Sequence, residues 1–550
     1  MSPISQINFM SLIAPMIPVK KRVFQLLLLT SALTAAAQGN HTSQFSTLNS
    51  QLDYRVETQA TVASGDNNPL WLNANKYGLS SLDTSNGYLR AAVGRSLDQD
   101  SLRRWGLGAK VDMAVGYGMT STVVVQQAYG EVRWLKGLLT VGSKEQPAEL
   151  KNNELSSGSQ CLGINARPVP QVRLSLPDYI NVPLTKGWLG LKGHFAYGRM
   201  TDDGWQKDFT HERSRHTASV LLHTKAGYLR LHMPGSPLTI EGGLEMACEF
   251  GGKIMTKNAA GEYTYYEEAS TNLKSFVRAI IPGGNDHEAK YGTNQLYQGA
   301  EGNHVGAWNA RISWDRPSWG VSIYGDHYFE DMSQLFHLDY DGYTSDDDWR
   351  DTHGRSRYLV YDLKDMLLGV ELRLKRCNWL SNVLVEYIHT KYQSGPIYHD
   401  HTQTIPDHIG GRDSYYQHGI YTGWQHWGQV MGNPLYRSPL YNTDGQIVVE
   451  DNRFRALHVG VSGTLLTDRG SSATGGRLHY RLLGTVQKGY GSYGTPFTDP
   501  RRNLSLLAET TYALRGWAEG VSVRLGLAMD RGSLLGDNAG AQLTLVYQVP

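Results

Sequence analysis

The 550-residue sequence lacks long apolar runs beyond its first forty residues. Nowhere in that part do about 18 apolar residues follow one another, which excludes helical membrane spans there. Cysteine is scarce: Cys161, Cys248 and Cys377 form an odd, widely spaced set, which excludes a disulfide framework and a cysteine-based metal site. Neither sign of charge is in excess, since 52 Lys and Arg accompany 51 Asp and Glu, so the composition does not indicate a nucleic-acid partner.

Glycine and amphipathic aromatic residues are abundant instead. Glycine contributes 60 residues, about 11% against a usual ~7%. The chain also holds 32 Tyr and 13 Trp beside only 11 Phe. Most of its aromatic side chains therefore combine an apolar ring with a polar edge, and such side chains favour positions with one wet side.

The N-terminus has the pattern of an export signal. Basic residues 20–22 are followed by the apolar run VFQLLLLTSAL and by the small residues 35–37. A charged segment, a short apolar segment and a small-residue cleavage site together are typical of a secretory signal peptide. We therefore predict a signal peptide over residues 1–37, cleavage after Ala37, and a mature chain of residues 38–550 that starts at Gln38.

Segments of about ten residues with alternating apolar and polar side chains recur from Gln51 to the end. In AYGEVRWLKGLLTVG, residues 128–142, the pattern predicts a β-hairpin with a turn at Lys136-Gly137. Beside this turn we expect Trp134 in a periplasmic aromatic girdle, and Trp314 and Trp319 in the same girdle beside another turn. The predicted lipid-facing residues are Ala128, Gly130, Val132 and Trp134, and the predicted lumen-facing residues are Glu131 and Arg133.

About eighteen such segments can be counted, each long enough to cross a bilayer as a tilted strand. Short turns alternating with long polar loops favour an all-β fold, a transmembrane antiparallel β-barrel. A soluble sandwich with aromatic core residues remains the alternative. A propeller is not favoured, because this sequence lacks the repeat of ~40 residues that propellers have.

Residues 271–284 have helical spacing that ends at Pro282-Gly283, and we expect a helical insertion there that caps or plugs the barrel. The predicted tight turns are 136–137, 225–227, 316–318 and 515–516 onward, and the predicted long loops are 144–167, 201–215, 251–300, 331–366 and 393–453.

Several motifs together resemble a known family. They are NNPLWLNANKYGLSSLD (67–83), NARPVPQVRLSLPDYINVPLTKGWLGLKGHFAYGRMTD (165–202), HYFEDMSQLF (327–336) and GRDSYYQHGIYTGWQHWG (411–428). The resemblance is to the capsule assembly Wzi family of bacterial outer-membrane proteins, in its Bacteroidetes form, and spans about residues 50–545. It implies a barrel of about eighteen strands with short periplasmic helices, and a surface lectin that retains or organises capsular polysaccharide.

The densest polar and aromatic stretch, 411–436, is the main candidate for glycan contact. Aromatic faces suit the CH faces of sugars, and polar neighbours suit their hydroxyl groups. The alternative is that these aromatic residues pack the loop on itself or into the barrel mouth. A second candidate is the segment 68–78, whose alternative role is to be locked into the lumen. The candidate glycan-binding residues are Arg412, Asp413, Tyr415, Tyr416, Tyr421, Trp424, Trp427 and Trp71.

No motif points to catalysis, a cofactor or a metal. A hydrolase needs a nucleophile with a base, and no GxSxG sequence is present. The acidic run 346–348 is more typical of an exposed loop than of a cation site, and His399, His401 and His408 share a loop without an HExxH pattern. We therefore expect no enzyme, no cofactor and no metal site.

The leading hypothesis is a non-enzymatic, lectin-like protein of the cell outer membrane that binds and helps assemble or retain capsular polysaccharide. Its expected partners are capsular or other surface polysaccharide, outer-membrane lipid and other capsule export components. Two hypotheses from other classes remain: a porin for sugars or small polar solutes, and an outer-membrane hydrolase. A plugged lumen without conductance would favour the lectin over the porin.

Overall fold

The computed structural model describes residues 52–257, 263–280, 302–330, 365–399, 408–467, 476–514 and 518–549. The predicted signal peptide and Gln38, the acidic run 346–348 and His401 lie outside these described residues.

Eighteen strands form one antiparallel sheet that closes on itself, which confirms the predicted barrel and its strand number. Each strand pairs with the next barrel strand along the chain, and the barrel closes between β1 and β25, from Arg55 opposite Gln548 to Ser64 opposite Ala539. Closure leaves no unpaired sheet edge, as a structure that crosses lipid requires. The barrel strands are β1 (Asp53–Ser64), β2 (Ser85–Arg95), β3 (Trp105–Tyr117), β4 (Val123–Trp134), β5 (Gly137–Ser143), β6 (Gln171–Asn181), β7 (Leu189–Arg199), β9 (Leu221–His232), β10 (Leu238–Phe250), β13 (Asn303–Asp315), β14 (Trp319–Glu330), β15 (Met366–Leu374), β16 (Asn382–His389), β21 (Phe454–Thr467), β22 (Gly476–Gly491), β23 (Pro496–Ala513), β24 (Val521–Gly532) and β25 (Asn538–Gln548).

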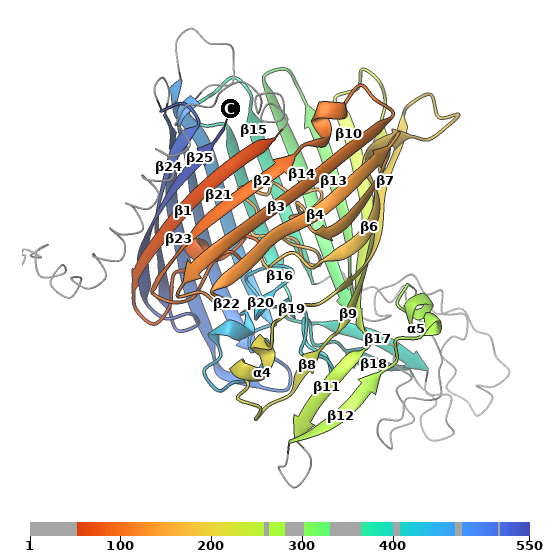
Figure 1. The fold of residues 1–550 in the computed structure, drawn as a ribbon, viewed down its shortest axis with the longest axis vertical. Coiled ribbons are helices and arrows are strands. Elements are labelled where there is room, and N and C mark those ends of the chain that lie inside the picture. The colour runs from red at the N-terminus through yellow and green to blue at the C-terminus, as the bar shows by residue number, and fades with distance from the viewer. Residues whose placement is uncertain are drawn as a thin grey trace, which may run out of the picture.

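The connections define a short-turn end and a long-loop end. Turns 135–136, 233–237 and 316–318 lie at the short-turn end, where the described chain also ends (Figure 1, upper side). The long connections 144–170 and 390–453 both start from the opposite end. Outer-membrane barrels have short periplasmic turns and long extracellular loops. The short-turn end is therefore periplasmic and the long-loop end faces outward.

One predicted turn is wrong. Residues 225–227 continue the alternation of β9 and pair with β7 on one side and with β10 on the other. The sequence KAG resembles a turn, but its small residues fit the outer and inner faces of a strand equally well. Pairing with two neighbouring strands overrides the local turn preference at this point of the chain.

The strands show the predicted alternation of lipid-facing and lumen-facing side chains. Trp134 is 57% exposed, and a Cβ at Gly130 would meet nothing within 4 Å, whereas Glu131 is only 6% exposed and bonds inside the barrel. In the described part of the chain, six tryptophans are highly exposed, and all of them lie at the short-turn end. They form the predicted periplasmic girdle: Trp105, Trp134, Trp188, Trp314, Trp319 and Trp379.

The α-helices of the described residues lie in the long connections. The predicted helix is found as α5 (Leu273–Arg278), whose N-cap Asn272 accepts a hydrogen bond from the amide of Ser275 at 2.9 Å. The expectation that it caps or plugs the barrel is wrong for these residues, because Phe276 packs on Tyr197 of β7 and Phe250 of β10, which face outward. The helix α4 (Trp205–Phe209) also belongs to a long connection. Helices on the periplasmic side were expected, but within the described chain only the 3-10 turn η2 (Leu97–Asp100) lies there. No helix among the described residues is long and apolar enough to span a membrane.

Three connections fold into the barrel and form its core. We call residues 65–84, 144–170 and 413–453 together the lumen plug. Their apolar side chains join those of the barrel wall in one buried cluster, which includes Leu72, Leu155 and Tyr436. The hydrophobic core of this protein therefore lies inside the barrel, and its lipid-facing surface is a separate apolar layer.

Candidate functional site

The stretch 413–436 lies inside the lumen plug. The side chains of Tyr415, Tyr416, Trp424 and Tyr436 are exposed by 1% or less. The rings of Tyr416 and Tyr436 stack with their centroids 3.8 Å apart. These rings pack the loop into the barrel, as the alternative interpretation held, and in this structure they offer no surface to an external polymer.

Hydrogen bonds tie this stretch to segment 144–170. The indole Nε1 of Trp424 donates to the carbonyl oxygen of Cys161 at 2.8 Å. The hydroxyl of Tyr416 donates to the carbonyl oxygen of Gln160 and accepts the amide of Asn433 at 2.9 Å. Such bonds satisfy polar groups that burial would otherwise leave without a partner, so they fix how the two segments pack.

Trp427 differs from the other aromatic residues of the stretch. It is half-buried and sits at the tip of a small hairpin between β19 (Gln425–His426) and β20 (Gln429–Val430). Both turn residues have positive φ, 56° at Trp427 and 76° at Gly428, as in a type I′ turn. Asn is favoured at the first position, and a bulky residue there is strained. The guanidinium of Arg167 lies 4.1 Å from the Trp427 ring centroid.

Trp71 lies in the short helix α3 (Leu70–Asn73) and is 2% exposed. Its Nε1 donates to the hydroxyl of Thr485 at 3.2 Å, and its ring centroid lies 4.9 Å from that of His458. The N-terminal segment is therefore locked against the barrel wall, which matches the alternative stated for it.

The remaining candidates are spread along the loop. Tyr421 is 4% exposed, and its hydroxyl donates to the carbonyl oxygen of Gly251 at 3.2 Å. Asp413 is 9% exposed. Arg412 ends β18 (His408–Arg412), and its side chain lies outside the described part of the chain. The candidate residues thus do not converge on one open site.

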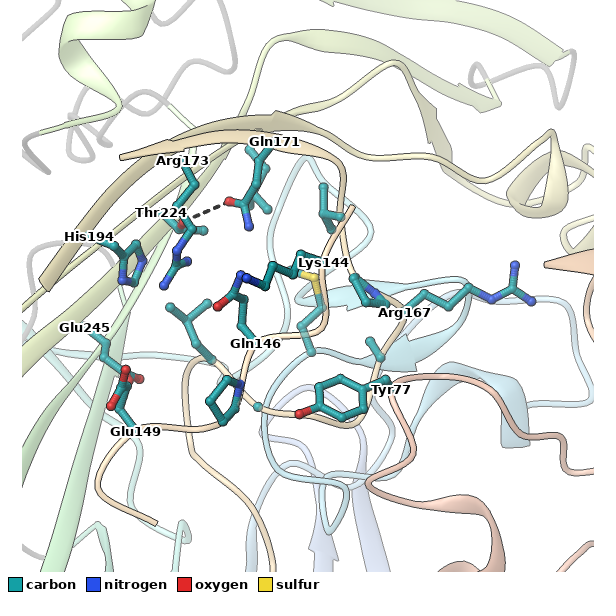
Figure 2. A pocket seen from close by; sticks show the side chains of 18 of the residues that line it. Tyr77, Lys144, Gln146, Glu149, Arg167, Gln171, Arg173, His194, Thr224 and Glu245 are labelled. Carbon is teal, nitrogen blue, oxygen red and sulfur yellow. Dashed lines mark hydrogen bonds between the residues drawn. The ribbon is translucent and has the colours of Figure 1, made fainter. Parts of the chain in front are cut away.

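A pocket of about 110 Å³ lies between the plug and the barrel wall. The wall side comes from β6, β7, β9 and β10, and the plug side includes Lys144, Gln146 and Arg167 (Figure 2). In Figure 2, the Arg173 side chain extends from β6 toward Lys144 and Gln146. The volume suffices for several water molecules or for one polar group of a larger ligand.

The charges of the pocket are only partly compensated. Lys144 pairs with Glu131 at 2.5 Å, and Glu149 pairs with Lys192 at 2.6 Å. For Arg173, by contrast, we find no ion pair among the described residues. The Nε2 atom of His194 is buried and also has no hydrogen-bond partner in the described chain. The pocket therefore offers unused polar groups to hydroxyl or carboxylate groups.

Burial shifts the pKa of His426 and of Asp451 in the plug. It lowers the pKa of His426 to about 4, so the ring is neutral. As a neutral ring, His426 donates from Nδ1 to the carbonyl of Arg167 at 2.9 Å and accepts the Thr201 amide at Nε2 at 3.2 Å. Burial also raises the pKa of Asp451 to about 7, against hydrogen bonds that lower it. The described residues hold no group of three or more His, Cys, Asp or Glu placed to bind a metal.

Sequence reasoning did not identify segment 144–170 as part of a core. Lys151 in this segment forms an ion pair with Asp326 at 2.9 Å, and both side chains are almost completely buried. Glu386 accepts hydrogen bonds from the hydroxyl of Ser156 and the amide of Ser157, both at 2.8 Å. The absence of alternation in 144–170 was the available signal, but a loop outside the barrel has the same pattern.

Comparison with solved structures places the fold. The chain is similar to Wzi of Escherichia coli, an outer-membrane protein involved in group 1 capsule assembly and described as a carbohydrate-binding β-barrel. The TM-score is 0.52 at 13% identity, over 94% of this chain and 91% of that one. Pseudomonas aeruginosa OprD gives a TM-score of 0.41 at 10% identity, over 91% and 94% of the two chains. P. aeruginosa OccK5 gives 0.43 at 10% identity, over 91% and 98%.

At such identities the likeness to Wzi establishes a shared fold and no shared ligand. No protein-family model matches the sequence. No curated protein matches it. The closed barrel, its lipid-facing surface and its tryptophan girdle define the class: this is an outer-membrane β-barrel protein. Within that class it is a Wzi-like barrel by fold, filled by its own loops.

Proposed function

We propose that this protein is a non-enzymatic, lectin-like member of the Wzi family that binds a surface polysaccharide at its long-loop end and helps assemble or retain capsule. The observation that carries this proposal is the lumen plug. Three separate connections fill the barrel with buried side chains, whereas a porin of this size keeps a water-filled channel.

Buried polar contacts make the plug a fixed part of the fold. The Lys151–Asp326 pair joins the plug to β14, and removing one partner of such a pair costs about 3–5 kcal/mol. Glu386 of β16 holds the same segment through Ser156 and Ser157. Opening a channel would break these contacts together, so the plug favours binding over transport.

The likeness to Wzi supports polysaccharide as the ligand. That protein has the same fold over nearly its whole length and is described as carbohydrate-binding. The motifs quoted from this sequence also resemble the Wzi family, and they include segments that build the plug.

The proposed glycan contact lies at Trp427 and at the pocket beside it. Of the aromatic candidates in 413–436, Trp427 is the one that is partly exposed, and its ring packs on Arg167, which lines the pocket. A ring face suits a sugar, and the unused donors of Arg173 suit its hydroxyl or carboxylate groups. The buried aromatic residues position this surface and make no contact with glycan.

Trp427→Asn tests the proposal. Asn suits the type I′ turn, so the hairpin should be kept while the ring is lost. We expect weaker binding of the detergent-solubilised protein on a glycan array, by about 1–3 kcal/mol, and capsule shed from cells that carry the variant. Trp379→Asn removes an exposed tryptophan at the opposite end and should change neither result. Unchanged binding by Trp427→Asn would refute the site.

Conductance separates the proposal from its alternative. In planar bilayers we expect the wild-type protein to show no steady channel current, because the plug fills the lumen. A stable current that sugars reduce would establish the porin instead, and the plug would then be a movable gate and not a fixed support.

A further inference from the structure

The outer surface of the barrel carries a row of cations at its long-loop end. Arg455 of β21 lies opposite Lys488 of β22, which lies opposite Arg502 of β23. We call these three residues the cation row. Their strands lie side by side in the barrel wall (Figure 1).

Strand alternation places the cation row on the lipid-facing side. The next outward position is Leu457 on β21 and Val486 on β22, and these side chains are 48% and 56% exposed. The inward neighbours Phe454 and Gln487 are buried. Side chains of one strand face alternate sides, so the row continues the apolar belt toward the long-loop end.

The position of the row along the membrane normal matches the outer membrane–water interface. Tyr480 of β22 donates a hydrogen bond to the carbonyl of Trp379, a residue of the periplasmic girdle, at 2.6 Å. Lys488 lies eight residues further along the same strand. At ~3.4 Å per residue and a tilt of ~40°, this is roughly 21 Å along the membrane normal. The apolar band of such barrels is about 25 Å tall, so Lys488 lies close to its outer boundary.

The positive charge of the row is not neutralised locally. For Arg455, Lys488 and Arg502 we find no ion pair within the described part of the chain. Lys391 and Lys488 lie 4.8 Å and 5.5 Å from the centroid of the same Tyr490 ring. A tyrosine flanked by cations at the edge of an aliphatic belt is typical of side chains at the level of lipid headgroups.

We propose that the cation row binds the phosphate groups of an anionic outer-leaflet lipid, a phosphorylated lipopolysaccharide, on the outside of the barrel. Arg and Lys form charge-assisted hydrogen bonds to phosphate oxygens. The aliphatic side chains of Leu457, Val486 and Leu504 lie next to the row on its periplasmic side and contact the acyl chains. Capsular polysaccharide is a poorer match, because these side chains continue the lipid-facing belt and do not point into the lumen. This inference does not depend on the proposed polysaccharide binding.

The first test compares lipids and needs no variant. The full-length protein in detergent is titrated with lipopolysaccharide, with enzymatically dephosphorylated lipopolysaccharide and with phosphatidylcholine, and bound lipid is counted by native mass spectrometry. We expect only the first to be retained. Inorganic phosphate at matched ionic strength should not displace it, because the acyl chains contribute to binding. Equal retention of the dephosphorylated lipid would overturn the proposal, and displacement by inorganic phosphate would show a simple anion site instead.

The second test replaces the row. A triple variant with Arg455→Gln, Lys488→Gln and Arg502→Gln should bind lipopolysaccharide roughly 100-fold more weakly. Each cation near a charged surface contributes about a factor of five to binding. The matched control, Arg104→Gln with Lys136→Gln and Arg376→Gln, removes three exposed cations at the short-turn end and should bind like wild type. Glycan-array binding should be unchanged in both variants. An equal loss in the control, or no loss in the row variant, would refute the assignment.

Discussion

Trp424→Ala separates a packing role from a ligand-contact role for the aromatic residues of 413–436. The side chain is completely buried, and its Nε1 donates to the Cys161 carbonyl at 2.8 Å. Truncation of a buried Trp to Ala costs about 3–5 kcal/mol. Within that sum, a buried carbonyl left without its donor contributes about 1–3 kcal/mol.

This cost falls on the plug and not on the barrel. The backbone bonds of Trp424, from its amide to Tyr416 and from Met431 to its carbonyl, both at 3.1 Å, lie within the loop. Strand pairing of the eighteen-stranded sheet involves neither. We therefore expect normal membrane level and normal heat-modifiable gel mobility, while the plug opens more often. A loss of about 4 kcal/mol corresponds to a roughly 10³-fold increase in the open population.

Amide hydrogen exchange in detergent measures this opening directly. The reporter is Gly163, whose amide donates to the Met431 carbonyl at 2.9 Å across two plug segments. We expect its peptide to exchange roughly 10³-fold faster in Trp424→Ala, by the same conversion of free energy to population, while peptides of β22 and β23 keep their protection. The reasoning is refuted if Gly163 keeps wild-type exchange while glycan binding is lost, because Trp424 would then contact the ligand.

Two further changes test the lipid face and the buried carboxyl group. Val111→Arg, at a position 51% exposed near the middle of β3, should cost roughly 2–4 kcal/mol in reversible unfolding from lipid, while Leu102→Arg in a fully exposed turn should be neutral. Burial raises the pKa of Asp451 above its value in the unfolded chain, so the folded state binds an extra proton between about pH 4 and 7. The stability of the plug should therefore fall as pH rises through this window and level off above it. Asp451→Asn should abolish the pH slope of the protection factor of the Tyr490 amide, which donates to Asp451 at 3.0 Å. A slope of the protection factor that persists would assign the titration to another group.

The barrel wall could be predicted because lipid imposes a strict pattern on it. Every second residue of each strand faces either hydrocarbon or the lumen, so the period of two is visible without any tertiary information. Trp134, Trp314 and Trp319 were placed in the girdle for the same reason, since each stands beside a turn. The run at 225–227 failed because three residues alone do not distinguish a turn from a strand of small residues.

The plug could not be predicted because its stabilising contacts link residues that are far apart in the sequence. Trp424 bonds to Cys161, and Lys151 pairs with Asp326; no local pattern joins either pair. The composition of 411–436 fits glycan contact and loop packing equally well, since both need aromatic rings beside polar groups. Burial separates the two roles, and it depends on whether the loop folds into the lumen or outside it.

The strained turn at Trp427 connects the plug to the proposed site. A tryptophan with φ of 56° costs about 1–2 kcal/mol and persists only where the surrounding structure holds it. A Cβ on the neighbouring Gly428 would lie 2.5 Å from the Trp205 ring, so the backbone at Gly428 packs closely against Trp205. A binding ring fixed by a rigid support loses little entropy when a ligand binds. If Trp427 contacts glycan as proposed, the buried aromatic residues of the same loop contribute to affinity by keeping its ring in place.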